Sequence, residues 1–264
     1  MLKSKPLLVI ATILTTLALV AHAHRHERGP GYIPKQTGRG PATVKVAVVD
    51  SGLDLKDPRF ARVLCQTGHK DVTDTTLDDL DGHGTHITGL IKQYAGGEGY
   101  CIMIVKYYTS AASGKLNSER MIKAIRWAVS HGASFVNISA GGPNFEEQEF
   151  VLFRDNPRAH FIVAAGNNGI NLDLCGFSNV KDHCYFPASY HSKNMIVVGN
   201  QDKDGLRAES SNFGYVVVNE WEMGVDVEST LPGGRAGLMS GTSQATAIHT
   251  GKIIRKRITH ERVR

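Results

Sequence analysis

The sequence predicts an α/β protein, a three-layer sandwich in which helices cover both faces of a mostly parallel central sheet. Three observations lead to this prediction. Short, almost wholly apolar strands alternate with amphipathic helices, and such strands need cover on both faces. No internal repeat or low-complexity tract interrupts this pattern. The 264 residues, 41% hydrophobic with 28 glycines, suit one large domain rich in tight turns.

The expected elements follow from apolar periodicity and from residues that start or stop helices. The first strand is an apolar run that ends at Asp50, and the first helix carries Ile87, Leu90 and Ile91 on one face. Strands are expected at 44–50, 102–107, 135–139, 161–165 and 195–199, short β segments at 215–218 and 225–228, and helices at about 83–94, 118–131, 145–154 (capped by Asn144) and from 243 onward.

Residues 1–23 have the pattern of an export signal. Lys3 and Lys5 give a charged start, residues 7–20 form an apolar run, and Ala21-His22-Ala23 matches a small-x-small cleavage site. The run is shorter than the roughly 20 residues that a membrane span needs, so an uncleaved anchor is the less favoured alternative. We therefore expect cleavage after Ala23 and a secreted or periplasmic protein.

The charge that remains after cleavage limits the expected partners. Removing residues 1–23 leaves 28 of the 30 Lys and Arg residues against 25 Asp and Glu, a net charge of +3. This excess is too small to indicate nucleic-acid binding. We expect an extended arm over 24–43 and a folded domain over 44–264 that acts as a monomer, without nucleic acid and without stable membrane association.

The four cysteines predict two disulfides, because exported proteins fold in an oxidising compartment. Three pairings are possible. We favour Cys65–Cys101, which ties the segment after the first strand to the start of another strand, together with Cys175–Cys184, which closes a short loop. The other two pairings stay open at this point.

Three polar residues stand where strands end or helices begin, which is where chemistry gathers in a parallel sheet. Asp50 ends the first strand, His83 begins a helix and Ser243 opens another. Each has a plainer interpretation. Asp50 could cap a turn and Ser243 could cap its helix. His83 and His86 could bind a metal with Asp50 or Asp81.

The combination favours nucleophilic catalysis over these alternatives. A serine hydroxyl is a poor nucleophile until an imidazole takes its proton, and the imidazole needs a carboxylate to fix its tautomer. The start of a helix also offers unpaired N–H groups to a developing oxyanion. Asp50, His83 and Ser243 supply these three groups.

Five short motifs, in one order along the chain, resemble those of the subtilisin-like serine peptidases (subtilases). The likeness runs from about residue 44 to 252. The matching stretches are 48–52 (VVDSG), 81–86 (DGHGTH), 137–142 (NISAGG), 164–167 (AAGN) and 240–243 (SGTS).

The resemblance implies a subtilisin-like fold and a secreted serine endopeptidase that works through an acyl-enzyme and needs no cofactor. It makes Asp50 the residue that orients His83, His83 the general base and then the general acid, and Ser243 the nucleophile. Asn167 matches the side-chain oxyanion donor, with the Ser243 backbone N–H as its partner.

The resemblance also implies that an extended substrate pairs along Ser139, Ala140 and Gly141. His86 is then a packing residue. Residues 172–183 fall where relatives build part of the primary specificity pocket and are expected to reshape it.

The sequence departs from the family's pattern in two further places. A compact turn at 94–99 replaces the familiar calcium-binding loop, so no metal is expected there. Residues 24–43 are too short for a folding prodomain, so we expect folding unaided or with another chain. Two other functions remain as alternatives: a catalytically silent subtilase-fold protein that binds peptides, and a His-ligated metallohydrolase.

Overall fold

The computed structural model describes residues 44–177 and 183–262. The predicted signal at 1–23 and the arm at 24–43 lie outside the described residues. Within those two ranges, none of the helices combines the length and the apolar character that a membrane crossing requires.

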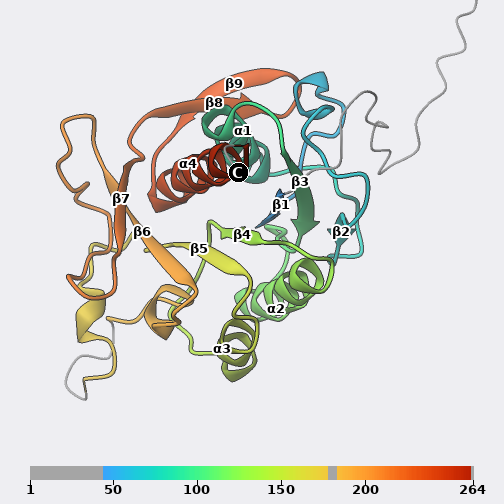
Figure 1. Ribbon diagram of the computed structural model, residues 1–264. Helices are drawn as coiled ribbons and strands as arrows, with labels where there is room; N and C mark the ends of the chain where they lie inside the picture. Colours follow the sequence, from blue (N-terminus) through green and yellow to red (C-terminus); the bar gives the residue numbers. More distant parts are fainter. Residues whose placement is uncertain (1–43, 178–182, 263–264) are drawn as a thin grey trace, which may run out of the picture.

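A seven-stranded sheet forms the middle layer, and every neighbouring pair of strands in it is parallel (Figure 1). The strand order is β2-β3-β1-β4-β5-β6-β7. Its strands are β1 (Val44–Asp50), β2 (Lys70–Asp71), β3 (Tyr100–Lys106), β4 (Phe135–Ile138), β5 (His160–Ala164), β6 (Met195–Gln201) and β7 (Glu220–Met223).

Helices cover both faces of this sheet, which confirms the predicted three-layer sandwich. In Figure 1, α1 and α4 lie on one face and α2 and α3 on the other. Because strand side chains alternate between faces, Val48 packs in the core that contains Ile87 and Ile248, whereas Val49 packs in the core that contains Ile125. The helices are α1 (His83–Ala95), α2 (Gly114–Ser130), α3 (Glu147–Arg154) and α4 (Thr242–Arg262).

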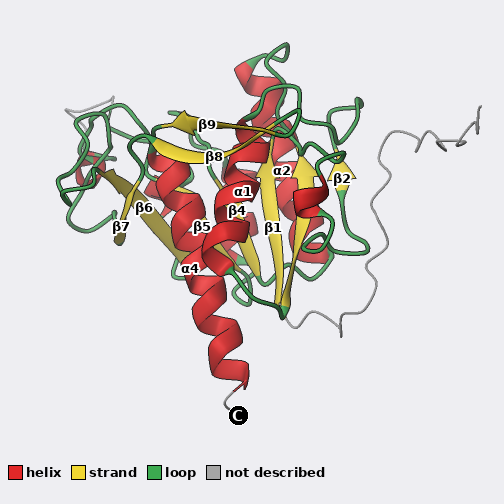
Figure 2. Cartoon of the chain, turned by 90° about the horizontal axis from the view of Figure 1, so that it is seen from above, coloured by secondary structure: helices red, strands yellow, loops and turns green. Residues whose placement is uncertain are grey.

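A separate antiparallel hairpin, β8 (Val227–Leu231) and β9 (Arg235–Met239), lies over the start of α1 (Figures 1 and 2). His86 joins helix and hairpin: its ring Nε2 lies 3.1 Å from the carbonyl oxygen of Val227 and 3.2 Å from that of Gly237. Only a ring N–H can bond two carbonyl oxygens, so Nε2 carries the proton. The hairpin thus braces the helix that begins with His83.

Both favoured disulfides are present, so the predicted pairing is confirmed. Cys65 is bonded to Cys101 across a sequence separation of 36, and Cys175 to Cys184 across a separation of 9. The first disulfide joins the segment between β1 and α1 to the start of β3.

Two helices begin two or more residues away from their predicted starts, and α4 begins one residue early, at Thr242. α2 starts at Gly114 instead of residue 118, because the Ser113 side chain caps it by accepting a hydrogen bond from the Leu116 N–H at 3.2 Å. α3 starts at Glu147, and its N-cap is Glu146 without a side-chain bond, so the predicted cap at Asn144 is wrong.

The predicted β segment at 215–218 is wrong as well. The backbone there forms a turn around the carboxylate of Asp173, which accepts hydrogen bonds from the N–H groups of Tyr215, Val216 and Val217 at 2.6 to 3.1 Å. The strand on this side of the sheet is β7, two residues further on. The segment predicted at 225–228 is displaced to β8.

Candidate active site

The candidate residues gather at the carboxyl edge of the sheet. Asp50 is the last residue of β1, His83 the first of α1, and Ser243 the second of α4. Ser139 follows β4, whose Ile138 pairs with Val49 of β1, so Asp50 and Ser139 continue neighbouring strands. Adjacent strands lie about 4.8 Å apart, so Asp50 and Ser139 lie side by side at the end of the sheet.

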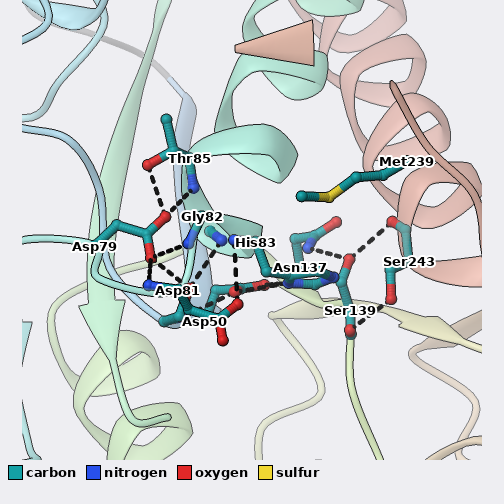
Figure 3. A network of polar contacts seen from close by, with 12 residues as sticks. Asp50, Asp79, Asp81, Gly82, His83, Thr85, Asn137, Ser139, Met239 and Ser243 are labelled. Atoms are coloured by element: carbon teal, nitrogen blue, oxygen red, sulfur yellow. Dashed lines mark hydrogen bonds and ion pairs between the residues drawn. The ribbon is translucent and has the colours of Figure 1, made fainter. Parts of the chain in front are cut away.

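Asp50 and His83 form a close pair (Figure 3). His83 Nδ1 lies 2.8 Å from Oδ1 and 3.0 Å from Oδ2 of Asp50. An ionised carboxylate only accepts hydrogen bonds, so Nδ1 carries the proton and Nε2 is left as the basic nitrogen. The carboxylate is 5% exposed and also accepts from the Ser51 N–H at 2.7 Å.

Gly84 allows this close approach. A Cβ at Gly84 would overlap the carbonyl oxygen of Gly52 and would lie 3.2 Å from Asp50 Oδ1. The first turn of α1 can therefore rest directly on the end of β1 only with glycine at this position.

Three carboxylates set the pKa of His83. Burial lowers it, but the charge and hydrogen bond of Asp50 and the charges of Asp81 and Asp79 outweigh burial, so the pKa lies above the ordinary value of 6.5. The imidazolium form is stabilised at this site, as a group that takes up a proton during a reaction requires.

Ser243 bonds to Ser139 in both directions. The Ser243 hydroxyl donates to the Ser139 carbonyl oxygen at 2.8 Å, and the Ser139 hydroxyl donates to the Ser243 carbonyl oxygen at 3.0 Å (Figure 3). Among the residues that the structure describes, no hydrogen bond joins Ser243 to His83. The structure thus brings Asp50 and His83 into contact and places Ser243 at the neighbouring strand end, with its hydroxyl on a different acceptor.

Asn167 is anchored through its amide oxygen. Oδ1 accepts from the Thr242 N–H at 2.9 Å and from the Thr242 hydroxyl at 3.1 Å. Its Nδ2 makes no hydrogen bond within the described ranges, and the residue is exposed. Asn167 therefore keeps an uncommitted amide donor beside the first residue of α4, next to Ser243.

The segment Ser139, Ala140 and Gly141 runs along the edge of the site. In the described part of the chain, the backbone groups of Ala140 and Gly141 form no backbone hydrogen bonds. Gly142 is paired, exchanging hydrogen bonds of 2.8 and 2.7 Å with Phe186. The two unpaired residues leave room for an extended chain to add alongside.

Sequence reasoning missed a buried carboxylate that holds the turn before His83. Asp79 Oδ1 accepts from the Ser51 hydroxyl at 2.9 Å and from the Gly82 N–H at 2.8 Å, and Oδ2 accepts from the N–H and hydroxyl of Thr85 at 2.8 and 2.7 Å. Burial raises the pKa of Asp79, but these bonds outweigh it and hold the pKa below the ordinary 3.8. The local signal that indicates this turn, though not its role, is an Asp three residues before a glycine, a common turn pattern.

A second buried polar chain, also missed, ties α4 to β4. Thr250 donates from its hydroxyl to Asn137 Oδ1 at 2.8 Å, and Asn137 Nδ2 donates to the Ser139 hydroxyl at 3.0 Å. These bonds connect the body of the Ser243 helix to the segment that holds the Ser243 hydroxyl.

The two histidines of the 81–86 motif serve different neighbours. His83 faces Asp50, whereas the fully buried His86 is bonded to the β8–β9 hairpin. Burial lowers the pKa of His86, which keeps it neutral. The Nε2 proton of His86 is committed to two carbonyl oxygens, which does not fit a metal ligated by both histidines through that nitrogen.

A carboxylate–imidazole pair and a helix-start serine at the carboxyl edge of a parallel α/β sheet are together typical of a serine hydrolase. Comparison with known proteins narrows this class. Residues 42–255 match the model of the subtilase family, a peptidase family, and the chain therefore belongs to the subtilase family.

Individual relatives agree with this family. Subtilisin amylosacchariticus of Bacillus subtilis subsp. amylosacchariticus is 32% identical over 216 residues, covering 78% of this chain and 53% of the relative. Subtilisin-like protease 6 of Trichophyton verrucosum is 31% identical over 238 residues, covering 83% and 53%. The chain thus spans about half the length of these curated relatives. A crystal structure of a lanthipeptide protease shares the fold, with a TM-score of 0.69 at 24% identity over 83% of this chain and 75% of that one.

Proposed function

We propose that this chain is a secreted or periplasmic serine endopeptidase that cleaves peptide bonds through an acyl-enzyme on Ser243. The observation that carries the proposal is the Asp50–His83 pair, held at the strand end next to the one that binds the Ser243 hydroxyl. Membership of the subtilase family supports protein or peptide substrates. Two disulfides support export to an oxidising compartment.

In this proposal, the Ser243 hydroxyl leaves the Ser139 carbonyl and turns to His83 when substrate binds, as catalytic hydrogen bonds often tighten only in the complex. His83 Nε2 takes the hydroxyl proton while Ser243 Oγ forms a bond to the peptide carbonyl carbon. Asp50 keeps the imidazole in the required tautomer and stabilises the imidazolium.

The carbonyl oxygen then carries the negative charge. In this proposal, Asn167 Nδ2 and the Ser243 N–H donate to that oxygen; the Nδ2 group is the available end of the amide because the Asn167 oxygen already accepts from Thr242. The C–N bond breaks as His83 returns the proton to the leaving amine. Water, deprotonated by the same imidazole, attacks the acyl-enzyme and restores the Ser243 hydroxyl.

A fluorophosphonate probe tests this proposal, since it labels only a serine that an adjacent base activates. The mature protein should be labelled on Ser243, and Ser243→Ala should neither label nor cleave a denatured protein substrate. His83→Ala should fold and lose both activities, because the side chain of His83 is 29% exposed and lies outside the cores.

One observation favours a second function, a silent protein that binds peptides without cutting them: the Ser243 hydroxyl is bonded to Ser139 instead of His83. The same experiment separates the two. Peptide binding with no labelling of Ser243 would establish the silent protein and refute the peptidase.

A further inference from the structure

This inference rests on the proposed reaction, which fixes where the substrate side chain just before the cleaved bond must lie. The attacked carbonyl carbon must meet Ser243 Oγ while its oxygen faces Asn167 Nδ2. Ser139 holds the Ser243 hydroxyl, and Asn167 binds the residue before Ser243. These two partners follow neighbouring strands, β4 and β5. The side chain next to that carbonyl must therefore leave between segments 139–142 and 164–167, a space that we call the recess.

The ring of Tyr185 occupies this recess. A Cβ placed on Gly141 would lie 2.6 Å from ring atom Cε1 and 2.9 Å from Cζ. A Cβ placed on Gly166, from the opposite segment, would lie 2.8 Å from Cδ1 and 2.9 Å from the same Cε1. One edge of the ring therefore touches both walls at once, and the two glycines are what makes room for it.

The backbone around Tyr185 is fixed from several directions. The Tyr185 N–H donates to the Ser189 hydroxyl at 3.2 Å, and the Ser189 N–H donates to the Tyr185 carbonyl oxygen at 2.9 Å. The next residue, Phe186, is paired with Gly142. The preceding residue belongs to the Cys175–Cys184 disulfide. A ring carried by such a backbone does not leave its place by loop movement alone.

The ring is held by packing and not by its hydroxyl group. Within the described residues, the Tyr185 hydroxyl makes no hydrogen bond. Burial raises its pKa to about 12, so the hydroxyl stays neutral. A phenylalanine at this position would fill the same space. Tyr185→Phe is therefore a variant that removes the hydroxyl group and keeps the ring.

We propose that Tyr185 determines specificity by filling the recess, so that the enzyme cleaves after glycine, alanine and serine and rejects large apolar and aromatic residues at that position. The recess walls, Gly141 and Gly166, already lie in contact with the ring. A side chain with more than two heavy atoms beyond Cα would have to share the space with an aromatic ring.

The test is a comparison of the parent with Tyr185→Ala and Tyr185→Phe, each in mature form. A proteome-derived peptide library gives the residue before each cut, and two matched substrates with alanine or leucine at that position give kcat/KM. The parent and Tyr185→Phe should cut after small residues. Tyr185→Ala should raise the leucine-to-alanine ratio of kcat/KM on the order of 100-fold, the scale on which pocket size discriminates.

Folding is followed by circular dichroism, and Tyr185→Val, which removes most of the ring but stays apolar, replaces Tyr185→Ala if the latter does not fold. Frequent cuts after leucine or phenylalanine by the parent, or an unchanged ratio in the folded variant, would overturn the inference while Ser243 labelling still supports the peptidase. Absence of Ser243 labelling in the parent overturns the peptidase itself, and the inference with it.

Discussion

Replacing Asp79 by asparagine tests whether a buried carboxylate positions His83, the base of the proposed reaction. Asp79 is 5% exposed, and its two oxygens accept five hydrogen bonds: one from the Ser51 hydroxyl, two from the turn before His83 and two from Thr85 in the first turn of α1. Asparagine retains one acceptor oxygen and replaces the other by an NH₂ group. If that group faces Thr85, two bonds to Oδ2 are lost and a backbone N–H is left without an acceptor.

The structure gives the size of the effect. Hydrogen bonds to a charged group contribute about 1.5–3 kcal/mol each, and an unsatisfied buried donor costs about 1–3 kcal/mol. The Ser51 and Gly82 bonds survive but lose their charge assistance. We therefore expect Asp79→Asn to lower the free energy of unfolding by roughly 3–5 kcal/mol. Fluorophosphonate labelling should slow by about 10- to 100-fold, because His83 follows the loosened turn.

The neighbouring Asp78 supplies a matched control. Its side chain accepts no hydrogen bond among the described residues, so Asp78→Asn should leave the urea midpoint and the labelling rate close to those of the parent. Urea unfolding monitored by fluorescence measures stability, and labelling is timed at pH 7.5 on variants that circular dichroism shows to be folded. If Asp79→Asn is as stable and as reactive as Asp78→Asn, the positioning role is wrong.

The difference between parent and Asp79→Asn should also depend on pH. Because the folded pKa of Asp79 lies below its ordinary 3.8, its contribution to stability is complete above that value. The contribution is lost as the pH falls through the folded pKa. The two stability curves should therefore converge only in strong acid.

Two further predictions concern charge and disulfides. Asp81→Asn should lower the pKa of His83 and move the acidic limb of kcat/KM to lower pH, because the Asp81 charge raises that pKa; an unmoved limb in low salt would contradict this. From the sequence separations of 36 and 9, loss of Cys65–Cys101 should cost about 3.8 kcal/mol and loss of Cys175–Cys184 about 2.6 kcal/mol. Urea unfolding of the two double-alanine variants measures both, and the reverse order would refute the loop-length reasoning.

The sequence predicts the central layers well because their signals are local. β1 and β3 are mostly apolar runs, and α1 has a one-sided apolar face. The failures come from contacts between distant residues. A turn at 215–218 resembles a strand in its valines, yet it is set by the carboxylate of Asp173, more than forty positions away. The partly exposed β9 lacks a buried apolar pattern and was not predicted.

The candidate site divides in the same way. Asp50 and His83 could be predicted because each stands at the end of a recognisable element. Asp79 and Tyr185 could not, since their importance depends on which groups surround them in space. Nothing in the local sequence indicates that the Tyr185 ring meets Gly166, which comes from another strand end.

The reciprocal bonds between Ser139 and Ser243 have a consequence for the resting reactivity of Ser243. The resting hydroxyl donates to a carbonyl on the very segment where a peptide would dock. Binding of a peptide along that segment would then release the Ser243 hydroxyl from Ser139 and let it turn to His83. The resting hydroxyl would then react more slowly with a small electrophile such as a fluorophosphonate than with the carbonyl group of a peptide that is paired along this segment.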